Sequence, residues 1–175
     1  MRTAFVVGHT KKDKGAYSEH LKVSEWDFYN EVLSHLKNPT VFYHDPKISG
    51  YTKRIKNTAS KLNKVDFDLV IELHFNAATP QANGCETLYY FNSKKSREYA
   101  RKFSEVVNRW TTIKLRNSGL KALVNSKDRG FASVFYPKAP TILIEPFFGS
   151  NEGDCRKIRD AKLMACIIED FIKQY

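Results

Sequence analysis

The segment DLVIELH, residues 68–74, is a short apolar run that ends on a histidine, a residue type that binds metal ions. Two other apolar runs end in a similar way, AFVVGH at His9 and TILIE at Glu145. Short β-branched runs of this kind alternate along the chain with longer amphipathic stretches, which is the pattern of βαβ units. We therefore expect one α/β domain over residues 1–175, with a mostly parallel twisted sheet flanked by helices on both faces.

The two periodicities also predict where the elements lie. Strands are expected at residues 3–7, 40–43, 68–73, 86–91 and 141–145, and helices at residues 26–36, 51–63, 96–110 and 155–172. Ser24, followed by Asp27 three residues later, resembles a capping box and places Glu25 in the first turn of the first helix. Residues 112–140 are rich in Lys, Ser, Asn and Gly, so we expect a loop region there, with a short strand at 122–125 and a role as a substrate-binding rim.

Composition and charge indicate which partners, cysteine chemistry and targeting segments to expect. The chain has 29 Lys and Arg against 19 Asp and Glu, a net charge of +10, which favours attraction to polyanions such as nucleic acid, anionic cell-wall polymers or acidic lipid. Its three cysteines lack CxxC spacing, which indicates reduced structural thiols. We expect neither a signal peptide nor a transmembrane segment, because the chain has no charged leader and no apolar run of about 18 residues.

The three runs that end in His9, His74 and Glu145 point to a shared site. The carboxyl ends of parallel strands meet at one edge of an open α/β sheet, where ligands bind. Glu25 joins them, because the helix after a strand begins near the carboxyl end of that strand. Two histidines and one carboxylate form a three-ligand catalytic zinc set with an open position for water. Glu145 is then the candidate general base, since an apolar surrounding raises the pKa of a carboxyl group.

The same residues lie in motifs that resemble the zinc-dependent N-acetylmuramoyl-L-alanine amidases, in particular the catalytic domains of bacteriophage endolysins. The matching stretches are VVGH, SEWDFYN, FDLVIELHFNA, GCETLYY and PTILIEPFFGSN, in the order of the family. The resemblance implies that His9, Glu25 and His74 bind one Zn²⁺ per chain and that Glu145 is the catalytic carboxylate. Glu19 stays open as a competing ligand to Glu25.

The resemblance also implies the substrate and the setting. The substrate would be bacterial peptidoglycan, cut at the amide between N-acetylmuramic acid and L-alanine. A catalytic domain that uses all 175 residues leaves no room for a separate cell-wall-binding domain, so we expect either a single-module lysin or an isolated domain of a longer protein. The protein would be made in the host cytoplasm and reach the wall after holin-mediated release, where its basic surface would contact anionic wall polymers.

Four further positions have two interpretations each. Glu72 lies two residues before His74, on the same face of a strand, so it could orient an imidazole or simply be a paired carboxylate. Glu86 could position substrate or cap a strand edge. His44 precedes Asp-Pro and is expected to be a turn residue. Phe147 could wall the cleft, although core packing is the safer interpretation.

Two other functions compete with the amidase. A zinc carboxypeptidase, or another zinc amide hydrolase, would use the same three ligands on a different bond. A basic nucleic-acid-binding domain would explain the charge, but the chain shows no zinc-finger or recognition-helix pattern, so we expect no specific nucleic acid partner.

Overall fold

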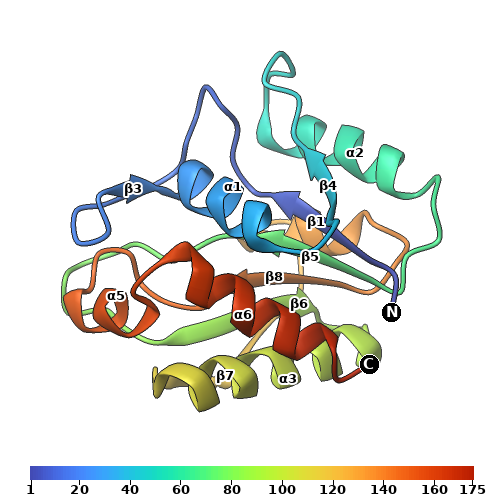
Figure 1. Cartoon of the computed structure of the whole chain (residues 1–175). Coiled ribbons are helices and arrows are strands. Elements are labelled where there is room, and N and C mark those ends of the chain that lie inside the picture. Colours follow the sequence, from blue (N-terminus) through green and yellow to red (C-terminus); the bar gives the residue numbers. More distant parts are fainter.

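Six strands form the central sheet of the computed structural model, which describes residues 1–175 (Figure 1). The strand order across the sheet is β4–β1–β5–β8–β6–β7. The strands are β1 (Thr3–Val7), β4 (Thr40–Tyr43), β5 (Leu69–Leu73), β6 (Cys85–Tyr90), β7 (Leu115–Leu123) and β8 (Thr141–Glu145). Five of them lie within one residue of the expected strands.

The sheet is mostly parallel, as the sequence predicts. β1 pairs in parallel with β4 and β5, and β5 pairs in parallel with β8. One pairing reverses direction, because β6 runs antiparallel to β8 and places Glu86 opposite Glu145. The amino end of β6 therefore lies at the same edge of the sheet as the carboxyl ends of β1, β5 and β8.

Helices cover both faces of the sheet. One face packs against α1 (Glu25–His35), α3 (Lys94–Thr111) and α6 (Ala161–Ile172), and these helices share the largest apolar cluster with alternate residues of β1, β5 and β8. Figure 1 shows α1 and α6 side by side on this face. The other face packs against α2 (Tyr51–Leu62) and α4 (Phe131–Phe135) through two smaller clusters. The expectation of a helix-flanked sheet is confirmed.

The expectation of a loop region over residues 112–140 is wrong. Leu115–Leu123 forms the edge strand β7, and Phe131–Phe135 forms the short helix α4. The strand is hard to recognise because it lies at the edge of the sheet, where polar residues replace a regular apolar alternation. Its register against β6 also shifts, next to a run of positive φ angles at Asn117, Ser118 and Gly119.

The last helix is also divided in a way that its sequence pattern did not predict. Residues 155–172 belong to two helices, α5 (Glu152–Ile158) and α6. Arg159 ends the first with a φ of 62°, and the side chain of Asp160 caps the second by accepting a hydrogen bond from the Leu163 backbone. The helical spacing of apolar residues continues across the break at Arg159 and Asp160. Periodicity alone therefore predicts a single helix.

The segment between β1 and α1 contains a small hairpin, β2 (Tyr17–Ser18) with β3 (Val23–Ser24). The hairpin folds back so that the Glu25 backbone N–H donates to the Ala16 carbonyl, at 2.9 Å. It thus fixes the start of α1 against the end of β1.

The three cysteines are free thiols, and they differ in environment. Cys85 and Cys155 are buried, and burial raises the pKa of Cys85 to about 12. Cys166 is exposed on α6, so the expectation of a structural thiol is wrong there. None of the helices has the length and apolar character needed to cross a membrane.

Candidate metal centre

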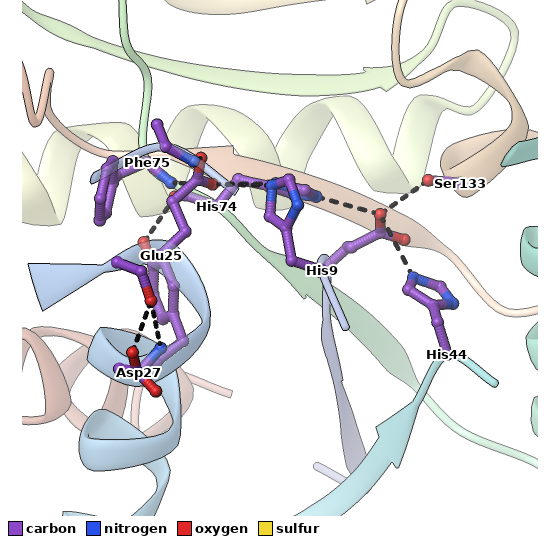
Figure 2. Close-up of polar contacts among 11 residues, drawn as sticks. His9, Glu25, Asp27, His44, His74, Phe75 and Ser133 are labelled. Atoms are coloured by element: carbon purple, nitrogen blue, oxygen red, sulfur yellow. Dashed lines mark hydrogen bonds and ion pairs between the residues drawn. The ribbon is translucent and has the colours of Figure 1, made fainter. Parts of the chain in front are cut away.

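Three side chains converge at the carboxyl edge of the sheet. Each of His9, Glu25 and His74 offers one ligand atom, and these atoms lie within 4.8 Å of one another. The Oε2 atom of Glu25 is 3.3 Å from Nε2 of His9 and 3.2 Å from Nδ1 of His74. Figure 2 shows the two imidazole rings next to each other, with the labelled Glu25 beside His74. The sequence prediction that these residues meet is therefore matched by the geometry.

The fold explains why residues far apart in the sequence meet. β1 and β5 are parallel neighbours with Val7 paired to Leu73, so His9 and His74 leave the sheet side by side. The Ser24 side chain caps α1 by accepting a hydrogen bond from the Asp27 backbone, as the capping box predicts. This cap sets Glu25 as the first residue of the helix, and it points to the end of β5.

Backbone hydrogen bonds hold the Glu25 carboxylate in place. Its Oε1 atom accepts from the Ala16 N–H at 3.0 Å, and its Oε2 atom accepts from the Phe75 N–H at 3.2 Å. Burial alone would raise its pKa, but the two histidines outweigh burial and lower the pKa of Glu25 to about 2. The carboxylate is therefore charged and fixed, as a metal ligand must be.

Two glycines leave room for the imidazole rings. A Cβ atom on Gly8 would lie 1.9 Å from Nε2 of His74, and one on Gly15 would lie 2.6 Å from the ring of His9. Gly15 also has a φ of +75°, which side chains other than glycine rarely adopt. Sequence reasoning missed both, although Gly8 stands directly before the first histidine.

Glu72 lies behind His74 in a buried polar group. Its Oε1 atom is 3.2 Å from Nε2 of His74 and accepts a hydrogen bond of 2.8 Å from the Ser133 hydroxyl on α4. Figure 2 shows this row running from His74 towards Ser133 and His44. Burial alone would lower the pKa of His74, but Glu25 and Glu72 outweigh it and raise the pKa to about 10.

His44 belongs to the same buried group, and the expectation of a turn residue is wrong. The residue is 3% exposed, and its Nδ1 atom lies 2.8 Å from the Thr58 hydroxyl of α2. Its Nε2 atom lies 4.0 Å from Glu72 and has no hydrogen-bond partner. Sequence position could not reveal this burial, because α2 covers β4 only after the sheet has formed.

Glu145 lies in the same pocket but outside the three-residue group. A cavity of about 390 Å³ is lined by His9, His74 and Glu145, together with residues of α2 and of the loop before α4. Burial raises the pKa of the Glu145 carboxyl above its usual value, and the charge of His74 partly offsets this. A carboxyl group with a raised pKa beside a candidate metal site has the properties expected of a general base.

The remaining candidates do not belong to the three-residue group. Glu86 is buried, accepts a hydrogen bond of 2.8 Å from the Asn76 amide, and lies 3.8 Å from the Arg116 guanidinium. Glu19 is exposed and pairs with Lys22, at 3.2 Å. Phe147 is fully buried in the core, which agrees with the core-packing interpretation and not with a cleft wall.

Comparisons with known proteins identify the family and similar folds. The family model described as N-acetylmuramoyl-L-alanine amidase matches residues 4–173. The fold is similar to that of an N-acetylmuramoyl-L-alanine amidase from Clostridium difficile 630, with 22% identity, a TM-score of 0.75, and coverage of 99% of this chain and 96% of that one. A search of curated proteins found no match.

Two further solved structures are similar in fold. The catalytic domain of an endolysin that targets Clostridia difficile has 24% identity and a TM-score of 0.76, with 99% of this chain and 97% of that one covered. The CwlD amidase from Clostridioides difficile, solved in complex with the GerS lipoprotein, has 19% identity and a TM-score of 0.74, with both chains covered in full at 100%.

Proposed function

The chain belongs to the N-acetylmuramoyl-L-alanine amidase family, and from this premise we propose that it is a zinc-dependent peptidoglycan hydrolase. The bond cut is the amide between the lactyl group of N-acetylmuramic acid and L-alanine. The observation that carries the proposal is the convergence of His9, Glu25 and His74, two of which, the histidines, line one pocket with Glu145.

The three side chains fit a zinc ion. Two imidazoles and one carboxylate are a usual ligand set of catalytic zinc. The Nε2 atom of His9 is buried and has no hydrogen-bond partner, although it lies in ion-pair range of Glu25. A buried nitrogen of this kind is costly unless it binds something, and a cation between the three side chains would satisfy it.

Glu145 carries the proton transfers in this proposal. When bound, zinc supplies a Lewis acid that polarises a carbonyl and lowers the pKa of a coordinated water molecule to about 7. Glu145 accepts a proton from the attacking water and returns it to the alanine nitrogen as the amide bond breaks. One water molecule is consumed, and the products are a lactyl carboxylate and a peptide with a free alanine amine.

Glu72 serves as a positioning residue. With one proton of His74 held on Nε2 and donated to Glu72, Nδ1 next to Glu25 is the atom that gives up its proton to bind the metal. The Ser133 hydroxyl holds Glu72 from the other side. Glu86 is a second positioning residue, at the edge of the site. It accepts a hydrogen bond from the side chain of Asn76, the second residue after His74.

The proposal also covers the biological role of the enzyme. We propose that the protein acts in host-cell lysis by a bacteriophage, reaching the wall from the cytoplasm after a holin opens the membrane. The similarity to an endolysin catalytic domain supports this role. The bacterial amidases among the similar structures support the alternative, a bacterial cell-wall amidase. Cytoplasmic production in a susceptible bacterium should be harmless until a holin is co-expressed, and lysis without a holin would contradict the proposal.

Digestion of purified peptidoglycan tests the activity. Mass analysis of the fragments should find stem peptides with a free L-alanine amino terminus, and a chelator should abolish their release. Zinc added back should restore it. Release of a C-terminal amino acid instead would indicate a carboxypeptidase.

A further inference from the structure

The pocket extends past the metal centre to a wall that the proposed chemistry does not use. This wall is built by Tyr51 and Arg54, one turn apart on α2, and by the loop that contains Lys127 and Arg129. The Tyr51 hydroxyl bonds the Ser133 hydroxyl at 3.1 Å, which fixes the ring against α4. The wall therefore presents polar and cationic groups from two separate segments to the same cavity.

Two of these groups are arginines without a partner. No carboxylate lies within 4.0 Å of Arg54 or Arg129, while other arginines of the chain, such as Arg101 and Arg109, form ion pairs. The Nε atom of Arg54 is fully buried and has no hydrogen-bond acceptor. A buried guanidinium N–H without an acceptor is costly, so its position suggests that a ligand supplies the acceptor.

Arg54 and Arg129 both line the pocket, and both are close enough to Tyr51 for their charges to act on its hydroxyl. Burial raises the pKa of Tyr51 to about 12, and the positive charges of Arg129 and Arg54 both act on its hydroxyl in the opposite direction. The neighbouring acid Asp128 is already engaged, because its carboxylate accepts the backbone N–H groups of Val124 and Asn125 at 2.7 and 3.0 Å. Both bonds go to Oδ2, and Asp128 forms no ion pair within 4.0 Å with either arginine.

We propose that Arg54 and Arg129 form a subsite for a free carboxylate on the peptide side of the substrate, beside the Tyr51 ring, whose hydroxyl donates to Ser133. Guanidinium groups bind carboxylates through two parallel hydrogen bonds, and this geometry is specific to the planar anion. The inference rests on the amidase activity proposed above. It adds that the enzyme selects its stem peptide by charge.

The chemistry of the substrate identifies the carboxylate. The glycan side of the scissile amide is neutral close to the bond, whereas the residue after the alanine is a glutamyl residue joined through its side chain. The α-carboxyl of that residue is free in some walls and amidated in others. A site built to pair with the carboxylate discriminates against the neutral amide, because the guanidinium donors then lack an anionic acceptor.

Two synthetic substrates test the proposal, N-acetylmuramoyl-L-alanyl-D-isoglutamate and its D-isoglutamine counterpart. We expect kcat/KM to be about tenfold to a hundredfold higher for the free acid, mainly through KM, since charge-assisted hydrogen bonds are lost with the amide. Arg54→Gln and Arg129→Gln should each reduce that preference, and the double variant should bring it to about twofold or less. Arg54→Lys should restore only part of it, because lysine lacks the fork of donors.

Lys53→Gln is the matched control. It removes a positive charge from the neighbouring position of α2, is exposed, and does not line the pocket. It should leave the preference unchanged. Equal kcat/KM on both substrates, or a preference that survives the double variant, would overturn the subsite.

A binding measurement separates this inference from the proposed reaction. Calorimetry with zinc-loaded Glu145→Gln compares the affinities for the two compounds without turnover. Tighter binding of the free acid, lost in Arg54→Gln/Glu145→Gln, supports the subsite even if the cleaved bond proves to be another. Equal affinities would refute the subsite while leaving the amidase activity standing.

Discussion

A single carboxylate oxygen organises the candidate metal centre. Oε2 of Glu25 lies between the nitrogens of His9 and His74 and also accepts the Phe75 N–H. These contacts hold the three candidate ligands next to one another. Glu145 shares the pocket without joining this group, which separates the proposed base from the proposed ligands.

Single substitutions should separate the two roles. We expect His9→Ala and His74→Ala to lose both bound zinc and activity. Glu145→Gln should keep about one zinc per chain while kcat falls by about 10²- to 10⁴-fold, the contribution of a general base. Elemental analysis of the purified variants, alongside turnover of a muropeptide, measures both quantities.

Glu19→Gln is the control for these variants and decides between the two candidate glutamates. Its side chain is exposed and pairs only with Lys22, so zinc content and turnover should stay at the level of the parent protein. Zinc loss from Glu145→Gln with an intact circular dichroism spectrum would make that residue a ligand and not a base.

Gly8→Ala should damage the site without removing a ligand. The new Cβ would lie 1.9 Å from Nε2 of His74, so the imidazole must leave its place between Glu25 and Glu72. We expect zinc affinity to fall about tenfold to a hundredfold, as for other changes that misorient a ligand. Gly153→Ala, where the nearest non-neighbouring atom is 3.3 Å away, should bind zinc normally in the same chelator competition.

At the level of elements, the amino end of α1 connects helix stability to the site. Ser24 caps this helix, and Ser93 caps α3 in the same way, each accepting a backbone hydrogen bond of 3.2 Å. The two helices differ in their relation to the site, because Glu25 is the first residue of α1, whereas no residue of α3 lines the pocket. Substitution of the two capping serines can therefore distinguish a general loss of stability from a displacement of the ligand Glu25.

Ser24→Ala and Ser93→Ala should each lower the free energy of unfolding by about 1 kcal/mol. Only Ser24→Ala should also weaken zinc binding, since frayed backbone at the start of α1 moves Glu25. Urea unfolding of the metal-free proteins measures the first effect, and chelator competition measures the second. Equal zinc affinities in the two variants would show that the cap does not position the ligand.

The strands that carry the site could be predicted from sequence for a physical reason. Buried parallel strands are continuous apolar runs, and their carboxyl ends share an edge, so runs ending in His9, His74 and Glu145 imply one location. The start of α1 was also readable, because Ser24 and Asp27 have the spacing of a cap. The apolar runs and the cap are local signals in the sequence. Placing them at one edge of the sheet required only the assumption of a parallel α/β topology, which is common.

The rest of the site depends on contacts that have no local signal. Ser133 meets Glu72 across 61 residues, and Tyr51 meets Ser133 across 82. Both contacts exist because α2 and α4 pack on the same face of the sheet. The reversed direction of β6, which sets Glu86 opposite Glu145, was equally hidden, since a strand pattern does not carry its direction.

At the level of the whole molecule, the net charge of +10 predicts how the protein accumulates on its substrate. Adsorption to isolated cell walls that carry anionic polymers should weaken steeply between about 0.05 and 0.5 M salt, because the Debye length falls from over 10 Å to a few Å. Sedimentation of the walls followed by assay of the supernatant measures the bound fraction.

Walls stripped of their anionic polymers provide the comparison for this prediction. They should bind less protein at low salt and show a smaller salt dependence. Adsorption that is strong and insensitive to salt on both kinds of wall would mean that recognition of the glycan or peptide, and not charge, retains the protein.

The different environments of the three thiols have a practical consequence. Cys166 is exposed on α6 and does not line the pocket, whereas Cys85 and Cys155 are buried and burial raises the pKa of both. Maleimide reagents attack accessible thiolates, so near neutral pH they should modify one position per molecule. A fluorophore or a targeting peptide could be attached there, giving a defined conjugate of the native sequence without cysteine mutagenesis.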